Sequence, residues 1–306
     1  ASSVIPLIKE TGREVVGVDL LPGTHTNFQL DISDNNLCAK LKYSLNEPIT
    51  IINLAAARAD FGAIADDYYQ ANIIAHQHFI NAINTFRIDK FIHVSSVASF
   101  DGKLIRYSKD LNCDDAYRAT KHLQENLIKK WCHHNNTPLI ILYPSAIFSN
   151  NVRLDTNMGK LQYFSSWVPF VPLINVKKSV TFLPNFSNFI LYHLDTKPIS
   201  KGYLTIENPL LSVTEIISAL SKRKLTSFKI PGLHGILWLI SWILFILGGF
   251  GRIDLKLTPN RVVKLFRETS YSSLEKVIDT KLYNSKFNEP LSKVLSTLNL
   301  SVSGKE

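Results

Sequence analysis

Hydrophobic and polar positions along the first half of the chain follow two patterns. Val4 to Lys9, Tyr68 to Phe86 and Ala116 to Trp131 have the period of about 3.6 residues that is typical of helices. Between them lie short, almost wholly apolar runs that predict buried strands, at residues 14–18, 49–54, 90–94 and 138–142. Apolar strands separated by helices indicate an α/β fold, in which a parallel sheet is covered by helices on both faces.

The alternation becomes irregular after about residue 150, where prolines occur at positions 169, 172, 184, 198, 209 and 231. At roughly 150 residues per domain, a chain of 306 residues has room for two domains. We therefore expect a first domain over residues 1–150 and a smaller second domain over 151–306 that is partly interleaved with the first.

The net charge and the spacing of the cysteines limit which partners and which cellular compartment are expected. The formal net charge of +9 suits nucleic acid, an anionic membrane or a phosphorylated small molecule. There is no basic arm and no aromatic-basic RNA motif, so nucleic acid is the least favoured partner. The three cysteines have no CxxC spacing, which favours a reducing, cytoplasmic compartment over disulfides. The histidines show no metal-binding spacing, so no metal site is expected.

Tyr117 and Lys121 form the most informative pair of polar residues. Residues four apart share one face of a helix, so the phenol and the ammonium would project together. A phenol with a pKa of about 10 is a poor base at neutral pH, but a nearby ammonium favours the phenolate. Of the 11 tyrosines, only Tyr117 has a lysine four residues later, and it follows a predicted strand that ends in Ser95–Ser96.

With these residues the chain resembles the extended short-chain dehydrogenase/reductases, the NAD-dependent epimerase/dehydratase family. The resemblance extends over essentially the whole chain. Its other carriers are Gly17–Val18–Asp19–Leu20, Leu30–Asp31–Ile32, Asn53–Leu54–Ala55–Ala56, Asn72, Val94–Ser95–Ser96 and Leu142–Tyr143–Pro144–Ser145. It implies a Rossmann-type dinucleotide-binding domain over 1–150 and a mainly substrate-binding domain over 151–306.

The resemblance also implies which residues hold the cofactor. Asp19 would bind the adenosine ribose, and because a carboxylate repels a 2′-phosphate, NAD is favoured over NADP. Asp31 and Ile32 would flank the adenine, and Ala55 and Ala56 would let the pyrophosphate approach the backbone. The remaining cofactor-binding positions are Leu54, Ser95, Tyr117, Lys121, Tyr143 and Pro144. For the two aspartates, a helix cap or an Asx turn is the structural alternative.

Catalysis in this family implies three roles. Tyr117 would take the proton of a sugar hydroxyl while hydride passes to the nicotinamide, Lys121 would hold the nicotinamide ribose and lower the Tyr117 pKa, and Ser96 would orient the reacting oxygen. A half-buried core tyrosine and a solvated lysine are the structural alternatives.

The sequence departs from the family pattern at three places. The first strand and its glycine-rich turn are not found before Ala1, so the chain as given is expected to bind a dinucleotide poorly. Tyr143 replaces an arginine, which alters the substrate pocket around Ser145. Ser96–Val97–Ala98 stands where sugar dehydratases carry Thr–Asp–Glu, so dehydration is disfavoured and epimerisation or redox chemistry remains.

Basic residues in the second domain favour a phosphorylated substrate. Lys178 stands where the family often has an arginine that contacts a diphosphate. Arg261, in a segment similar to bacterial nucleotide-sugar epimerases of surface polysaccharide synthesis, is a candidate phosphate clamp, because guanidinium binds phosphate in bidentate geometry. Solvated basic residues are the alternative for both. The expected substrate is a nucleotide sugar, probed first as a UDP-linked sugar.

Residues 230–251 contain no Asp, Glu, Lys or Arg. Their length reaches the threshold for a membrane span, but Pro231–Gly232 and Gly248–Gly249 shorten the helical part. A buried or partly exposed helix, a peripheral membrane contact and a true span are all open at this point.

These observations predict an NAD-dependent nucleotide-sugar epimerase or oxidoreductase. A 3β-hydroxysteroid dehydrogenase-like enzyme shares the catalytic set and would explain the uncharged stretch. A non-catalytic dinucleotide-binding scaffold would explain the absent glycine turn and Tyr143. A homodimer through the Tyr117 helix is implied by the resemblance alone.

Overall fold

The computed structural model describes residues 3–57, 64–149, 170–207, 209–221, 226–247, 259–271 and 278–286, with single positions at 159, 162, 163, 165 and 274. The chain divides into two compact units. The first comprises Ala1–Ile147, Thr181–Ile206 and Leu274–Phe287, and the second comprises Phe148–Val180, Glu207–Ser273 and Asn288–Glu306. The chain therefore leaves the first unit after Ile147 and returns to it twice.

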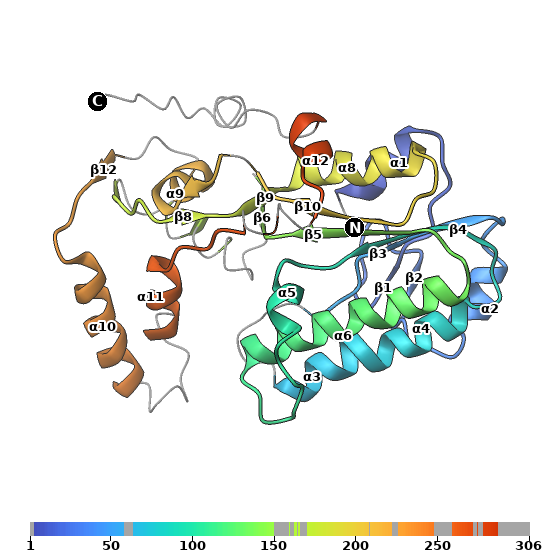
Figure 1. The fold of residues 1–306 in the computed structure, drawn as a ribbon, viewed down its shortest axis with the longest axis horizontal. Coiled ribbons are helices and arrows are strands. Elements are labelled where there is room, and N and C mark those ends of the chain that lie inside the picture. Colours follow the sequence, from blue (N-terminus) through green and yellow to red (C-terminus); the bar gives the residue numbers. More distant parts are fainter. Residues whose placement is uncertain are drawn as a thin grey trace. The chain divides into compact units, whose positions relative to one another are not determined.

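A parallel sheet of four strands, in the order β10-β5-β4-β3, forms the centre of the first unit (Figure 1). The strands are β3 (Ile49–Asn53), β4 (Ile88–Val94), β5 (Leu139–Pro144) and β10 (Lys201–Thr205). Phe91 of β4 pairs with Ile51 on one side and with Leu139 on the other. Every residue of β5 is buried, as expected of a strand covered on both faces. The parallel sheet that the apolar runs predicted is confirmed.

Helices cover both faces of this sheet (Figure 1). On one face lie α1 (Val4–Glu10), α8 (Leu183–Asp195) and α12 (Lys281–Lys286). They share an apolar core with the strands, in which the ring of Phe189 packs edge-on against Tyr203 and Tyr283. On the other face lie α5 (Ala98–Gly102), α6 (Cys113–His134) and the continuous run α3 (Ala65–Tyr69), η1 (Gln70–Ile74) and α4 (Ala75–Ile83), whose middle turn is π-helical. The short α2 (Leu37–Lys42) precedes β3.

The strand predicted over residues 14–18 was largely wrong. Only Val18–Asp19 forms β1, which pairs with β2 (Phe28–Gln29) in a separate two-stranded sheet. The Gly17 amide donates instead to the side chain of Asn27, at 2.9 Å. Because a side chain satisfies this backbone group, the ladder does not extend toward residue 14.

The described residues of the second unit form short strands and helices. Its strands form the parallel pair β7 (Phe170–Pro172) and β12 (Thr226–Phe228) and the antiparallel pair β8 (Lys177–Lys178) and β11 (Leu211–Ser212). Its helices are α9 (Val213–Leu220), α10 (Leu233–Leu247) and α11 (Pro259–Phe266). Strands β6 (Ala146–Phe148) and β9 (Val180–Phe182) pair where the chain passes between the units. Across the described residues, no helix combines the length and apolarity needed to cross a bilayer.

The contact between α5 and α6 gives a prediction about stability. A Cβ at Gly102 would lie 2.0 Å from the carbonyl oxygen of Arg118, so Gly102→Ala must push α5 away from α6. We expect a loss of at least about 4 °C in Tm, measured by thermal melting. The control is Gly235→Ala in α10, where a Cβ meets no atom within 4 Å and alanine favours the helix. Equal melting temperatures for wild type and Gly102→Ala would contradict this close approach.

Candidate active site

The predicted catalytic residues come from the end of β4 and the first half of α6. Asn112 caps α6, since its side-chain oxygen accepts a hydrogen bond from the Asp115 amide at 3.0 Å. This cap fixes where the helix starts and hence the direction of Tyr117 one turn further on and of Lys121 two turns further on. Ser96 lies two residues beyond the end of β4, near enough to the Tyr117 side chain to lower the pKa of its phenol. The structure therefore places Ser96 beside Tyr117.

Two opposing effects act on the Tyr117 phenol. Burial raises its pKa above the ordinary value, and the hydrogen bond with Ser96 lowers it, with burial the larger effect. The ring also packs edge-on against Tyr68, with centroids 6.0 Å apart. Tyr117 is therefore a neutral, oriented phenol whose contact with Ser96 favours the phenolate.

Lys121 is buried, and its ammonium is directed inward. Its Nζ donates to Gln124 Oε1 at 2.6 Å and to the Val94 carbonyl at 3.3 Å. Burial lowers its pKa to about 7, while the charge of Glu125 opposes this shift. An ammonium has three hydrogens. Among the described residues two of them have acceptors, which leaves one for a further partner.

Gln124 and His76 form a buried pair behind Lys121 that the sequence analysis did not identify. Because Gln124 Oε1 accepts from Lys121, its Nε2 must donate, and it does so to Ala55 O at 3.1 Å and to His76 Nε2 at 2.8 Å. The other nitrogen of His76, Nδ1, then carries the proton and donates to Ala71 O at 3.1 Å. Burial, followed by the charge of Lys121, lowers the His76 pKa to about 4, so the ring is neutral at pH 7.

Glu125 accepts hydrogen bonds from hydroxyl groups in three separate segments of the chain. Its Oε2 accepts from Ser95 at 2.8 Å and from Ser99 at 2.9 Å, and its Oε1 accepts from Tyr143 at 2.8 Å and from Lys129 at 2.5 Å. Burial alone would raise the Glu125 pKa, but these donors lower it on balance. The side chains of Ser95 and Tyr143, both predicted to bind cofactor, are thus directed at Glu125.

Asn72 lies in the π-helical turn and links the segment after β3 to α6. Its Oδ1 accepts from the Ala57 amide at 2.8 Å, and its Nδ2 donates to Thr120 Oγ1 at 3.1 Å. A single π-helical turn inside an α-helix often occurs at a functional site. Here it places Asn72 where it holds the chain just beyond Leu54, Ala55 and Ala56.

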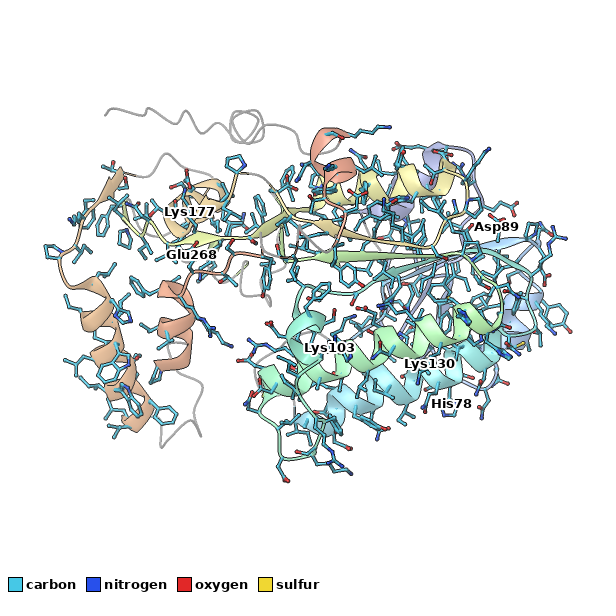
Figure 2. All side chains as sticks on the ribbon, in the orientation of Figure 1. His78, Asp89, Lys103, Lys130, Lys177 and Glu268 are labelled. Carbon is cyan, nitrogen blue, oxygen red and sulfur yellow. The ribbon has the colours of Figure 1, made fainter. Side chains whose placement is uncertain are left out.

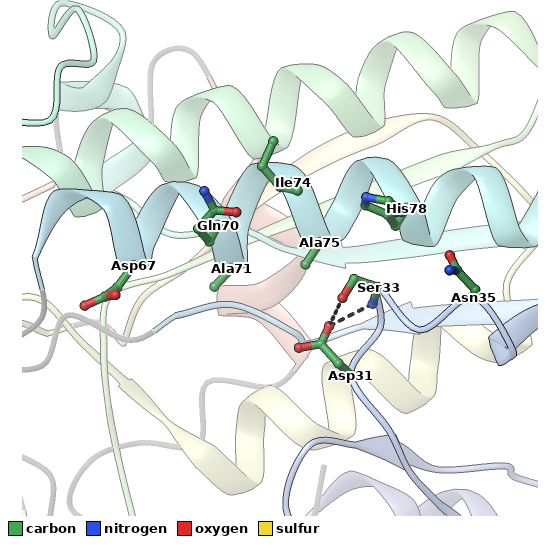
Figure 3. Close-up of a pocket in the computed structure, with 9 residues that line it drawn as sticks. All are labelled: Asp31, Ser33, Asn35, Asp67, Gln70, Ala71, Ile74, Ala75 and His78. Atoms are coloured by element: carbon green, nitrogen blue, oxygen red, sulfur yellow. Dashed lines mark hydrogen bonds between the residues drawn. The ribbon is translucent and has the colours of Figure 1, made fainter.

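The two aspartates predicted for adenosine are exposed and act as local caps. Asp19 Oδ1 accepts from the Leu21 amide at 3.0 Å, and Asp31 Oδ1 accepts from the amide and hydroxyl of Ser33 at 2.8 and 2.7 Å. Asp31 also borders a cavity of about 470 Å³ beside the run from α3 to α4 (Figure 3). The cavity is lined by Asp31, Ser33, Asn35, Asp67, Gln70, Ala71, Ile74, Ala75 and His78. Neither the neighbouring Ile32 nor the catalytic residues belong to this lining.

The remaining predicted positions are placed as follows. Pro144 ends β5, and its carbonyl accepts from the Val97 amide at 3.0 Å. The amide of Ser145 donates to Thr181 Oγ1 at 3.0 Å.

In the second unit, Lys178 Nζ donates to the carbonyls of Lys264, at 2.8 Å, and of Arg267, so it caps the end of α11. Arg261 lies within α11, and its side chain is outside the described residues. In the described part of the chain, no cluster of three or more His, Cys, Asp or Glu residues could hold a metal ion.

Lys121 gives a prediction about pH. Its pKa is about 7 in the folded chain against 10.5 for a free side chain, so the unfolded chain binds more protons between these pH values. The Lys121 contribution to stability therefore rises as pH rises through this window. Urea unfolding at pH 7 and pH 9 should show Lys121→Met losing stability relative to wild type at the higher pH. Lys130→Met, at an exposed position, should not. A constant difference between Lys121→Met and wild type would refute the inward-facing ammonium.

The chain was compared with known families, curated proteins and solved structures. The model of the NAD dependent epimerase/dehydratase family matches residues 1–165. No curated protein matches the chain. A UDP-glucuronic acid 4-epimerase from Bacillus cereus, solved with NAD, has a TM-score of 0.58 at 20% identity, covering 75% of this chain and 82% of that one.

Two further solved structures are similar to this extent. The UDP-N-acetylglucosamine 4-epimerase from Bacillus cereus has a TM-score of 0.57 at 15% identity, covering 74% of this chain and 81% of that one. The UDP-glucose 4-epimerase from Thermotoga maritima has a TM-score of 0.57 at 13% identity, with 74% and 82% covered. The fold is therefore Rossmann-type, as predicted. The family match over more than half of the sequence shows that this chain belongs to the NAD-dependent epimerase/dehydratase family.

Proposed function

We propose that this chain is a nucleotide-sugar epimerase that uses NAD and acts on a UDP-linked sugar for surface polysaccharide synthesis. The observation that carries the proposal is the placement of Ser96 beside the Tyr117 phenol, whose pKa it lowers, on the helix that also buries Lys121. A family match alone would fit an enzyme that has lost its chemistry. A serine, a phenol and an amine retained in this arrangement support one that keeps it.

The residues present fit a dinucleotide. The ammonium of Lys121 has one hydrogen to donate beyond its bonds to Val94 and Gln124, which suits a ribose hydroxyl. Asp19 and Asp31 expose carboxylates, and Asp31 borders a cavity of about 470 Å³, within the range of small-molecule sites. Ala55 and Ala56 add no bulk where a pyrophosphate would approach. Bound NAD supplies the chemistry of accepting a hydride from a sugar carbon and returning it.

The chain's own residues would then position the sugar and transfer the proton. Ser96 holds the reacting hydroxyl next to Tyr117, and the Tyr117 phenolate takes its proton. Ser96 lowers the pKa of the phenol, and charge on Lys121, one helical turn away, is proposed to favour the phenolate further. Tyr117 would then return this proton to the sugar oxygen, and inversion at the carbon would follow from hydride returning to its opposite face. Ser145 and the basic Lys178 and Arg261 are proposed to contact the substrate.

A direct test is proton NMR of UDP-glucose and UDP-N-acetylglucosamine incubated with NAD and the full chain. New anomeric signals should appear with wild type, and Tyr117→Phe should slow them by about 10²- to 10⁴-fold because the base is lost. Tyr107→Phe is the matched control, since that hydroxyl donates to the Ala65 carbonyl at 3.2 Å and, among the described residues, to no predicted catalytic group.

Negative outcomes separate the other candidates. If the chain binds NAD but leaves both sugars unchanged, while it oxidises a 3β-hydroxysteroid, the steroid dehydrogenase alternative replaces the proposal. If the chain binds NAD, as measured by calorimetry, but turns over neither the sugars nor the steroid, the scaffold interpretation replaces both enzymes.

Cofactor preference gives a second prediction. Removing the carboxylate in Asp19→Asn should reduce discrimination against NADP, because the repulsion of the 2′-phosphate is lost. The ratio of the two dissociation constants should shift toward NADP by about tenfold, with Asp34→Asn as control. An unchanged ratio would leave Asp19 as the turn cap that its bond to Leu21 makes it.

A further inference from the structure

The surface of helix α10 differs from that of every other helix described in the second unit. It packs against α11, where the rings of His234 and Phe266 meet at 4.8 Å. Its positions that are not classed as exposed are Leu233, Leu237, Ser241, Leu244 and Phe245. These recur at intervals of three or four residues and so form one seam along the helix. Ser241 is its one buried residue, and the Ser241 hydroxyl is satisfied by the Trp238 carbonyl at 2.6 Å.

The rest of the circumference of α10 is apolar and exposed (Figure 2). The exposed fractions are 48% for Ile236, 57% for Leu239, 41% for Ile240, 49% for Ile243, 55% for Ile246 and 71% for Leu247. At about 100° per residue these side chains share one broad face, which we call the outer face. Trp238 and Trp242 continue it, at 44% and 38% exposed. A patch of this size on one element marks an interaction surface.

Charge around the helix indicates what the outer face meets. From residue 216 to residue 253 the sequence has no Asp or Glu, and it has five cations: Lys222, Arg223, Lys224, Lys229 and Arg252. Lys229 is exposed four residues before α10. An uncharged helix inside an acid-free stretch of the sequence, with cations on both flanks, complements an anionic lipid surface.

The length of α10 determines how it would meet a membrane. Its 15 residues extend for about 22 Å, less than the roughly 30 Å hydrocarbon core of a bilayer. Over its described residues α10 is therefore too short to cross the bilayer, and it can lie along the interface. Tryptophans are enriched at that depth, where the ring is among acyl chains and the indole N–H reaches the headgroups.

We propose that the outer face of α10 inserts into the surface of an anionic phospholipid bilayer, with the helix axis parallel to the membrane. A second copy of the chain fits less well. A twofold dimer through this face would bring two sets of the flanking cations to one interface. A single partner helix would also cover a narrower stripe than the exposed apolar arc. The proposal is independent of the reaction proposed above.

The test is flotation of the purified full chain with vesicles of phosphatidylcholine alone or with 30 mol% (about a third) phosphatidylglycerol. We expect strong binding to the anionic vesicles that weakens with salt and in Lys229→Glu. The triple variant Ile236→Ser/Leu239→Ser/Ile243→Ser should bind more than about tenfold more weakly. The matched control, Leu20→Ser/Leu104→Ser, removes side chains that are 61% and 90% exposed in the first unit and should bind like wild type.

A second readout guards against a variant that misfolds. Brominated phosphatidylcholine in the anionic vesicles should quench the tryptophan fluorescence of wild type, and Trp238→Phe/Trp242→Phe should lose that quenching while still binding. Failure of wild type to float with anionic vesicles overturns the proposal. So does quenching that persists without these two tryptophans. A wild-type dimer in sedimentation velocity that the triple variant converts to monomer, with no vesicle binding, would assign the outer face to a second copy.

Discussion

The burial of polar side chains along one face of α6 is the constraint on which the arrangement of the first unit depends. Lys121, Gln124 and Glu125 are all buried there, and each would cost free energy if left without partners. Their partners come from separate elements: Val94 at the end of β4, Ala55 after β3, and Tyr143 on β5. Satisfying this one helix face therefore fixes the carboxyl ends of three strands against α6. The proposed catalytic groups lie at that edge.

Local spacing made part of this site predictable. Tyr117 and Lys121 share a helix face because they are four residues apart, and Ser96 comes directly after an apolar strand. The pair of Gln124 and His76 is different, because 48 residues separate them and neither position carries a motif. The one signal for Gln124 was its place three residues after Lys121, which puts a polar side chain on the buried face. The partner of such a residue is set by tertiary packing, which a periodicity does not contain.

The fold was predictable where elements are long and buried, and less so where they are short. Helix α6 and strands β3, β4 and β5 fall on the runs from which they were predicted, because period and apolarity persist over several residues. The strands of the second unit have two or three residues each, too few to show any alternation. The uncharged stretch from 230 to 251 predicted a helix, and α10 lies within it, but the sequence left the exposure of that helix open, since composition fits a core helix and an interfacial helix equally well.

Two lysines show that the role of a basic residue, too, could not be predicted from the sequence. Lys90, in the middle of β4, is 2% exposed, and its Nζ donates to the carbonyls of His193 and Thr196 at 2.5 and 2.7 Å, capping the end of α8. Lys178 does the same for α11. Both use a positive charge to satisfy the orphan carbonyls and the negative end of a helix dipole. A diphosphate at Lys178 would compete with that cap, so the proposed sugar chemistry depends on Tyr117, Lys121 and Ser96 more than on the basic residues of the second unit.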